Sequence, residues 1–194
     1  MHISDSSESP IRSSAEWNAR ARSRYAGAPA RSRDGFLAPY ALVLYRHGLY
    51  VIGGRLTNVE DDVRSAPIRV FAIERFADAE HVRTRDFTTP SDLNLRRVLA
   101  RGFGPHIGEP DVSHQVVIEF SPAKALFVSS REWHPSQQLE RTPNGALRLT
   151  FTCADLAPVV SWILEWGPHA KVLEPSGLAE KVVRELRGAL ARYD

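Results

Sequence analysis

The chain has 194 residues, of which 43% are hydrophobic, and its formal net charge at pH 7 is +2. This length suits one domain or two small ones with a sizeable core, and a charge so close to neutral gives no global argument for nucleic-acid binding. No apolar run approaches the roughly 20 residues of a membrane helix, and residues 1–14 lack the apolar centre of a signal peptide. We therefore expect a globular cytoplasmic protein without a membrane partner.

The first half of the chain reads as short strands. A weak alternating pattern indicates a first strand over 18–25, followed by a loop over 27–35. The clearest element is a hairpin with strands over 37–45 and 49–53. The residues Arg46-His47-Gly48 join these strands, and glycine tolerates the positive φ that a tight turn requires.

Residues 68–111 contain the last strand signals of the first half and the first helix signal. Apolar residues between 68 and 76 predict another strand, with residues 79–84 as a possible partner. Short strands joined by tight turns favour a small β-barrel over parallel βαβ units. A helix is predicted within 89–104, where Ser91 or Asp92 is a suitable cap, and a linker rich in proline and glycine extends to residue 111.

The last part of the chain predicts a regular series of strands and helices. Read in order, the elements are β-α-β-β-α-β plus a helix, which is the ferredoxin-like arrangement. The expected elements are a strand over 112–120, a helix over 122–129 capped by Ser121, strands over 137–141 and 146–153 around Pro143-Asn144-Gly145, a helix capped by Asp155 and ended by Gly167, a strand over 171–173, and a final amphipathic helix with Leu178, Val182, Val183, Leu186 and Leu190 on one face.

The residues that usually carry catalysis or metal binding form no motif. Cys153 is the only cysteine, which excludes an internal disulfide, and its neighbours Phe151 and Ala154 favour a buried thiol. The seven histidines show no metal-ligand spacing, and the sequence has no Walker loop, Gly-x-Gly-x-x-Gly or Gly-x-Ser-x-Gly. We expect no metal, no cofactor and no enzymatic activity, although catalytic triads do assemble from residues distant in sequence.

Two segments of the second half carry a resemblance to a known family. Trp133-His134-Pro135-Ser136-Gln137 and the segment from Gly167-Pro168-His169-Ala170 to Leu173-Glu174-Pro175 resemble the WCX extension that follows the WYL domain in bacterial regulators. From the residues alone, a Trp at a helix-to-strand junction packs the core more often than it binds a ligand, and His-Pro ends a helix. Trp162 and Trp166 share a helix face, which suits either the core or an interface.

The first half resembles the WYL domain, a small Sm-type or SH3-like barrel. Pro39-Tyr40 and Leu42 match the run ahead of the family's hairpin, Leu49-Tyr50-Val51 stands in place of the Trp-Tyr-Leu triplet, and residues 69–76 match a second family run. The sequence departs from the family at Leu49, which replaces the Trp, and at Ala72, which replaces an Arg that the family uses for ligand contact.

Together these observations predict the fold class and the domain bounds. The class is α+β, with a small Sm/SH3-like β-barrel followed by a ferredoxin-like α/β domain. The predicted parts are a disordered tail over 1–16, a WYL-type barrel over 17–88, a helix and linker over 89–111, and a WCX ferredoxin-like domain over 112–194.

The resemblance implies the ligand-sensing and oligomerisation part of a bacterial transcription-regulatory system. Family members place these domains behind a helix-turn-helix, and no such helix pair is readable ahead of the first strand. Three explanations remain open: a stand-alone sensor, a partner of a separately encoded helix-turn-helix regulator, and a fragment. Such regulators are generally dimeric, so a homodimer is expected.

The resemblance also suggests where a ligand would bind. Barrels of this type bind a nucleotide or single-stranded nucleic acid by stacking bases on rings while arginines contact phosphates. The predicted surface consists of Tyr50, Arg69 and Arg75, with Tyr45 and Arg46 as further contacts and Phe71 as another available ring. The alternative is that the rings belong to the core and that the arginines pair with Glu74 or Asp78. In that case the chain is an interaction and dimerisation module that has lost the ligand site.

Overall fold

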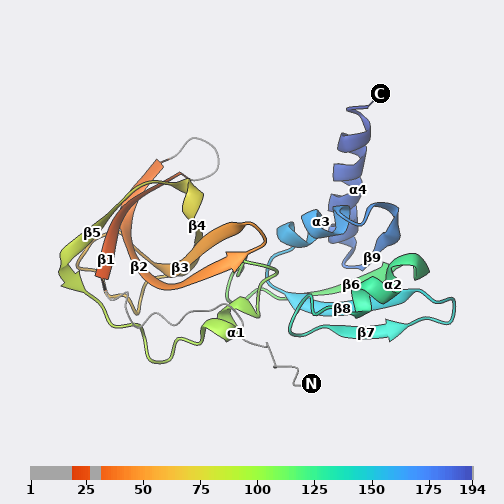
Figure 1. Cartoon of the computed structure of the whole chain (residues 1–194), viewed down its shortest axis with the longest axis horizontal. Helices are drawn as coiled ribbons and strands as arrows, with labels where there is room; N and C mark the ends of the chain where they lie inside the picture. Colours follow the sequence, from red (N-terminus) through yellow and green to blue (C-terminus); the bar gives the residue numbers. More distant parts are fainter. Residues whose placement is uncertain (1–18, 27–31, 194) are drawn as a thin grey trace, which may run out of the picture. The chain divides into compact units, whose positions relative to one another are not determined.

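The computed structural model describes residues 19–26 and 32–193. The predicted disordered tail over 1–16 lies outside these residues. The chain divides into two compact units between Leu93 and Asn94 (Figure 1). Both units contain antiparallel sheets, and the chain as a whole is a mixed α+β protein, as predicted.

A five-stranded antiparallel sheet with the order β4-β3-β2-β1-β5 forms the first unit. Figure 1 shows the sheet curled around a common interior. The strands are β1 (Ala19–Ala26), β2 (Ser32–Tyr45), β3 (Gly48–Leu56), β4 (Ile68–Ala72) and β5 (Phe76–Asp86), and a 3-10 turn, η1 (Ile73–Arg75), joins the last two.

The expectation of a closed barrel is corrected by the strand pairing. Within the described part of the chain, no ladder joins β4 to β5, so the sheet is open along this seam. The segment over 79–84, expected to pair with the strand before it, lies in β5 and pairs with β1 instead. The physical reason is η1, which redirects the chain after the short strand β4 and sends β5 to the opposite edge of the sheet.

The β2–β3 hairpin is longer than predicted, and its turn has a different conformation. Gly48 pairs with Tyr45 as the first residue of β3, so the turn consists of Arg46 and His47 only. The positive φ, 52°, falls on Arg46 and not on the glycine. A glycine suits position 48 for another reason, since a Cβ there would crowd the ring of Tyr50.

Tyr40 organises the core of the first unit. The residue is almost fully buried, its hydroxyl donates a hydrogen bond to the Val63 carbonyl at 3.2 Å, and its ring packs edge-on against Phe87 at 5.9 Å. A Cβ on Gly54 would lie 2.5 Å from the Tyr40 hydroxyl oxygen. The glycine therefore lets the tyrosine ring lie flat against β3.

The second unit is built on a four-stranded antiparallel sheet with the order β7-β8-β6-β9. Its elements follow the predicted β-α-β-β-α-β series with a final helix, preceded by one short helix. They are α1 (Leu95–Leu99), β6 (His114–Phe120), α2 (Pro122–Ser129), β7 (Gln138–Arg141), β8 (Leu147–Cys153), α3 (Ala157–Leu164), the 3-10 turn η2 (Gly167–His169), β9 (Ala170–Glu174) and α4 (Ser176–Leu190).

Local side-chain contacts explain where the helices begin. The cap of α1 is Asn94, whose Oδ1 accepts from the Arg97 amide at 2.9 Å, and not Ser91 or Asp92. Asp155 lies one residue ahead of the cap of α3, which is Leu156 and makes no side-chain capping bond; the Asp155 Oδ1 atom nevertheless accepts from the Ala157 amide at 2.9 Å. Ser121 precedes α2 as predicted but makes no capping bond, since its hydroxyl lies 2.9 Å from His169 Nδ1.

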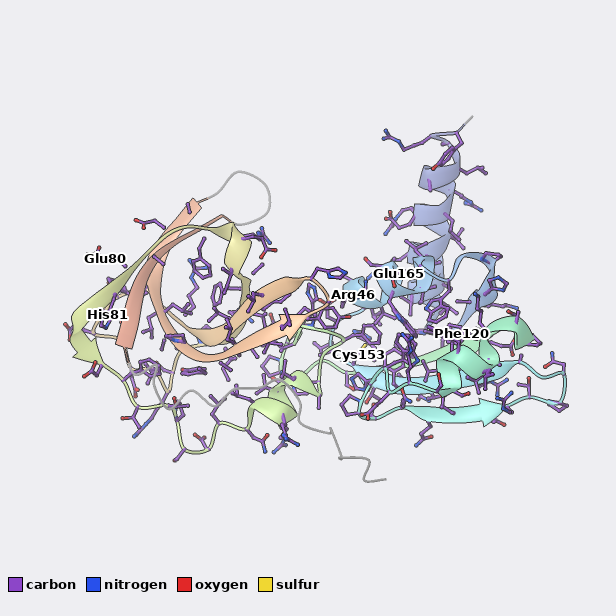
Figure 2. The ribbon with its side chains drawn as sticks, in the orientation of Figure 1. Arg46, Glu80, His81, Phe120, Cys153 and Glu165 are labelled. Atoms are coloured by element: carbon purple, nitrogen blue, oxygen red, sulfur yellow. The ribbon has the colours of Figure 1, made fainter. Side chains whose placement is uncertain are left out.

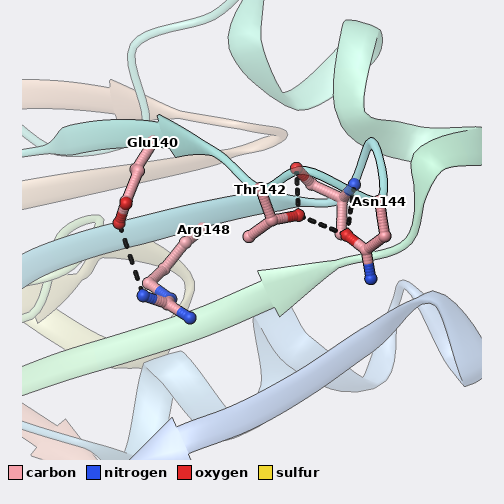
Figure 3. A network of polar contacts seen from close by, with 5 residues as sticks. Glu140, Thr142, Asn144 and Arg148 are labelled. Atoms are coloured by element: carbon pink, nitrogen blue, oxygen red, sulfur yellow. Dashed lines mark hydrogen bonds and ion pairs between the residues drawn. The ribbon is translucent and has the colours of Figure 1, made fainter.

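The β7–β8 hairpin confirms the predicted turn. Gly145 has a φ of 82°, and the Thr142 hydroxyl donates to Asn144 Oδ1 across the turn (Figure 3). Behind the turn, Arg148 contacts Glu140 on the neighbouring strand at 3.3 Å. Because both charged side chains are solvent-accessible, this ion pair contributes little to stability.

An aromatic cluster forms the core of the second unit. Trp162 lies at its centre, with its ring centroid 5.1 Å from that of Phe103 and 5.2 Å from that of Trp133. Trp166 is half-buried at the border of the cluster, 5.8 Å from Trp162. The Trp133 indole donates to the Val128 carbonyl at 2.9 Å. These three tryptophans therefore belong mainly to the core, which the sequence predicts for Trp133 and leaves open between core and interface for Trp162 and Trp166.

Candidate ligand surface on the first unit

Tyr45 and Tyr50 lie on the same face of the β2–β3 hairpin. Tyr45 is opposite Gly48, and Tyr50 follows Gly48 by two residues, so the pleat directs both tyrosines to one side. An ideal Cβ on Gly48 would lie 3.0 Å from Cε2 of Tyr50 and 3.1 Å from its hydroxyl oxygen. The missing side chain at Gly48 thus makes room for the Tyr50 ring.

Arg46 adds a guanidinium group to this pair of rings. Its Cζ atom lies 5.6 Å from the centroid of the Tyr45 ring, within the range of a cation–π contact. Arg46 is exposed at the tip of the hairpin (Figure 2), while both tyrosines are half-buried. The hairpin end therefore combines two accessible aromatic rings with one cationic side chain.

The other two predicted residues lie elsewhere. Arg69 pairs with Gly53, which lies three residues after Tyr50 in β3. Because successive residues of a strand point to opposite faces, Arg69 lies on the face of the sheet opposite to Tyr50. Arg75 is the last residue of η1. This turn directly follows Ala72, which pairs with Tyr50 across β3 and β4. The structure thus brings together Tyr45, Arg46 and Tyr50, leaves Arg75 on the adjoining turn and separates Arg69 from the group.

Phe71 belongs to the core, in agreement with the alternative interpretation of the strand aromatics. It is buried in β4 and its ring centroid lies 6.0 Å from that of Phe76. Its place in the register, opposite Val51, removes it from the face that carries the two tyrosines. The rings available to a ligand on this hairpin are therefore those of Tyr45 and Tyr50.

The hairpin also has an exposed apolar face, which is not among the predicted site residues. Leu44 and Leu49 are direct cross-strand partners, Leu42 is opposite Val51, and these three leucines are exposed. They occupy the face opposite to the tyrosines. In the sequence, Leu42 and Leu44 stand two residues apart, as residues on one face of a strand do. This spacing indicates a strand but does not show that its leucines are exposed.

Two buried titratable groups lie in the second unit. His134 is 2% exposed, and burial lowers its pKa below 6.5, against the opposing effects of its hydrogen bond to Gly102 and the charge of Glu132. Burial raises the pKa of the Cys153 thiol to about 11 (Figure 2). A thiol with this pKa is almost entirely protonated at neutral pH and is a poor nucleophile.

The described residues contain neither a metal-binding cluster nor a helix suited to a membrane. Over 19–26 and 32–193, no group of three or more His, Cys, Asp or Glu side chains is arranged to hold a metal ion. No helix in the same residues is long and apolar enough to cross a bilayer.

Comparison with known families gives one clear match. Residues 113–190 match the family model of the WCX domain. The resemblance read from Trp133–Gln137 and Gly167–Pro175 is thereby confirmed for this region of the chain. A comparison with curated proteins gives no match.

Two solved structures are similar to the chain. One is proteasome accessory factor B/C (PafBC) of Arthrobacter aurescens, with 23% identity and a TM-score of 0.38, over 91% of this chain and 25% of that one. The other is described as a CRISPR Cas-related protein, with 13% identity and a TM-score of 0.53, over 91% of this chain and 48% of that one. The second likeness shows a shared fold. This chain spans a quarter to a half of the length of these two proteins.

Proposed function

We propose that the chain is the ligand-sensing and oligomerisation part of a bacterial transcription-regulatory system, acting in the cytoplasm without catalysis. Its ligand is a nucleotide or a single-stranded nucleic acid, bound on the first unit. The WCX match over 113–190 and the Pro-Tyr-x-Leu and Leu-Tyr-Val runs of the first unit support this assignment. The order β7-β8-β6-β9, with α2 and α3 between strands, supports a ferredoxin-like second unit.

One observation carries the proposal of a ligand surface. Tyr45 and Tyr50 share one face of the hairpin because Gly48 leaves space for a ring, and the Arg46 guanidinium lies over Tyr45. Nucleobases stack on accessible rings, while arginine pairs with phosphate through a planar fork of donors. This combination suits a nucleotide unit, with Arg75 on the adjoining turn as a further phosphate contact.

The test is fluorescence-anisotropy binding of labelled single-stranded DNA, double-stranded DNA and RNA at two salt concentrations. Loss of a stacking ring in Tyr50→Ala should weaken binding by about 5- to 100-fold, since stacking contributes roughly 1–3 kcal/mol per base. Loss of a phosphate contact in Arg46→Ala should weaken binding and reduce the salt dependence by about one ion.

Arg69→Ala is the matched control, because it removes the same charge from the other face of the same sheet. It should bind as the unchanged protein does. If Arg69→Ala weakened binding as much as Arg46→Ala, the ligand surface would not be the tyrosine face. If the protein bound none of the three nucleic acids and no competing mononucleotide, the proposal would be rejected.

The opposite face of the hairpin favours a second candidate function. The exposed Leu42, Leu44 and Leu49 form a contiguous apolar surface, which in a monomer marks an interaction site. With Ala72 in place of the family's ligand-contacting arginine, this surface suits a protein-interaction module that partners a separately encoded helix-turn-helix regulator. Leu44→Glu should abolish capture of such a regulator and leave nucleic-acid binding unchanged.

A further inference from the structure

The helix α2 exposes only apolar residues, which are Pro122, Ala123, Leu126 and Phe127. The last three form the outer face of the helix, because their spacing of three and four residues places them on one side. Leu126 is 75% exposed and Phe127 is 44% exposed. On its inner side α2 packs on β6 and β8, and Ala125 and Val128 are buried there (Figure 1).

An apolar outer face is unusual for a helix at the surface of a domain. Such a helix ordinarily has an apolar side toward the core and a polar side toward water, and a helix that is apolar on both sides is usually covered. In α2 the only charged residue is Lys124. No other large aliphatic side chain in the described part of the chain is as exposed as Leu126. The outer face of α2 therefore has the character of an interaction site.

Phe127 is held in place by the aromatic cluster of the second unit. Its ring centroid lies 5.7 Å from that of Trp166 and 6.4 Å from that of Trp133. The guanidinium of Arg131 covers the ring, with its Cζ atom 4.1 Å from the centroid. The Arg131 carbonyl in turn accepts a hydrogen bond from Gln137 Nε2 at 3.1 Å. Because these side chains are already ordered, a partner that binds here pays little side-chain entropy.

Two cationic side chains border the outer face on the side of Phe127. Lys124 precedes Phe127 by three residues and Arg131 follows it by four. Neither forms an ion pair with any residue that the structure describes. Residues 120–131 contain no acidic side chain, and the charge of the next residue, Glu132, acts on His134. The charge of this border is therefore complementary to that of an acidic partner.

We propose that the outer face of α2 binds a short amphipathic helix of another protein. The apolar side of that helix contacts Leu126 and Phe127, and its acidic residues pair with Lys124 and Arg131. The two cations are seven residues apart, which corresponds to about 10 Å along a helix. Asp or Glu residues that are also seven apart match this distance. Binding of an amphipathic helix to an apolar surface is a common form of recognition. The proposal does not depend on the ligand surface of the first unit.

A nucleic acid or a membrane suits this face less well than a protein. Bases stack on open ring faces, whereas Arg131 covers the ring of Phe127, and Trp133 and Trp166 are half-buried. A phosphate backbone is bound through a larger set of cations than Lys124 and Arg131 provide. An anionic bilayer is disfavoured by Glu132, which is exposed directly beside Arg131.

The test begins with selection on the immobilised full chain from a displayed library of random peptides, each of about 16 residues so that a helix can form. We expect the enriched peptides to carry apolar residues at helical spacing and Asp or Glu residues seven apart. A synthetic copy of the most enriched peptide is then titrated by fluorescence anisotropy. Leu126→Ser should raise its dissociation constant by about 10-fold or more, because a buried leucine contact is lost. Arg131→Glu should raise it by about 5- to 10-fold through like-charge repulsion.

A charge exchange and a matched control make the result specific. Replacement of the matching acidic residue of the peptide by Lys should restore binding to Arg131→Glu, because opposite charges again face each other. Leu190→Ser is the control, since Leu190 is an exposed leucine of the same unit outside α2. It should leave the dissociation constant within about 2-fold of the original. Thermal unfolding followed by circular dichroism confirms that each variant is folded.

Enrichment of no peptide, or of basic peptides, would overturn the proposal, as would equal losses of binding in Leu126→Ser and Leu190→Ser. The other possible occupants are distinguished with the same variant. Self-association that Leu126→Ser abolishes, measured by sedimentation of the full chain, would assign the face to a second copy. Binding to phosphatidylglycerol vesicles that depends on Leu126 would assign it to a membrane, and Leu126-dependent binding of single-stranded DNA would assign it to a nucleic acid.

Discussion

The imidazole of His134 connects the core of the second unit to the segment that precedes its first strand. Its Nε2 atom lies 2.8 Å from the carbonyl oxygen of Gly102, and its Nδ1 atom accepts from the Ser136 amide at 3.1 Å. Because Nδ1 is an acceptor, the proton of the neutral ring is on Nε2 and is donated to Gly102. The ring also stacks on Phe151, with 5.3 Å between centroids.

This arrangement predicts that the free energy of unfolding falls in acid. The pKa of His134 is lowered in the folded state, so the unfolded chain takes up a proton, near pH 6.5, before the folded chain does. The contribution to stability is therefore complete above pH 6.5 and is lost as the pH falls toward the folded pKa. Urea unfolding at pH 7.5 and 5.5, with His134→Gln as a non-titrating comparison, measures it. An equal pH dependence in both proteins would contradict the prediction.

Removal of the ring should destabilise the fold at every pH. In His134→Ala the Gly102 carbonyl loses its donor, and a buried group left unpaired costs about 1–3 kcal/mol. We expect a loss of at least this size in the free energy of unfolding at pH 7.5. His47→Ala, in the exposed turn of the first unit, is the matched control and should change stability by less than about 0.5 kcal/mol.

Cys153 is expected to react slowly with thiol reagents in the folded protein. The side chain is 2% exposed, and its pKa of about 11 leaves very little thiolate at pH 8. Ellman's reagent should therefore report a slow, unfolding-limited reaction in buffer and a rapid one in concentrated guanidinium chloride. Equal rates under the two conditions would show that the thiol is accessible.

Gly54→Ala should destabilise the first unit. The added methyl group would lie 2.5 Å from the Tyr40 hydroxyl oxygen and 3.0 Å from Cβ of Ala66. Overpacking of this kind costs about 1–3 kcal/mol. Thermal unfolding followed by circular dichroism measures the loss.

Gly188→Ala is the control for that substitution. Gly188 lies in α4, and a methyl group added there would meet no neighbouring side chain within 4 Å, so alanine should stabilise the helix by up to about 1 kcal/mol. A similar loss of stability in both variants would mean that contact with Tyr40 is not the cause.

Trp133→Phe should cost less than Trp133→Ala. The first change keeps an aromatic ring but replaces the indole by a smaller one and removes its donor to the Val128 carbonyl, a hydrogen bond that contributes about 0.5–1.5 kcal/mol. The second also opens a cavity beside Trp162, with a loss of about 3–5 kcal/mol. Chemical denaturation separates the two values, and comparable losses would show that the hydrogen bond carries most of the contribution.

The sequence predicts elements best where short-range signals agree. Pro122 marks the start of α2, and Asn144-Gly145 marks the β7–β8 turn, because these residues act on their own backbone. The open seam between β4 and β5 is not predictable in this way, because pairing is set by η1, which has no strong local signature. The predicted cap of α1 falls too early because Ser91, Asp92 and Asn94 are all suitable capping residues, and the sequence does not distinguish among them.

The candidate site is predicted only in part. Tyr45, Arg46 and Tyr50 belong to a tight hairpin, and their proximity follows from the turn. The grouping of Arg69 with them rests on its position in a family motif, but the side of a strand depends on register, and a shift of one residue reverses every side chain.

The segment before β6 is part of the core of the second unit. Phe103 is buried against Phe151 and Trp162, the Ala154 amide donates to the Arg101 carbonyl at 2.7 Å, and a Cβ on Gly102 would lie 1.5 Å from the His106 carbonyl oxygen. The matched family region begins only at residue 113. A fragment cut there would lose a core aromatic side chain and the acceptor of His134. A fragment that keeps this core intact therefore has to start near Asn94, where the second compact unit begins, some twenty residues ahead of the matched family region.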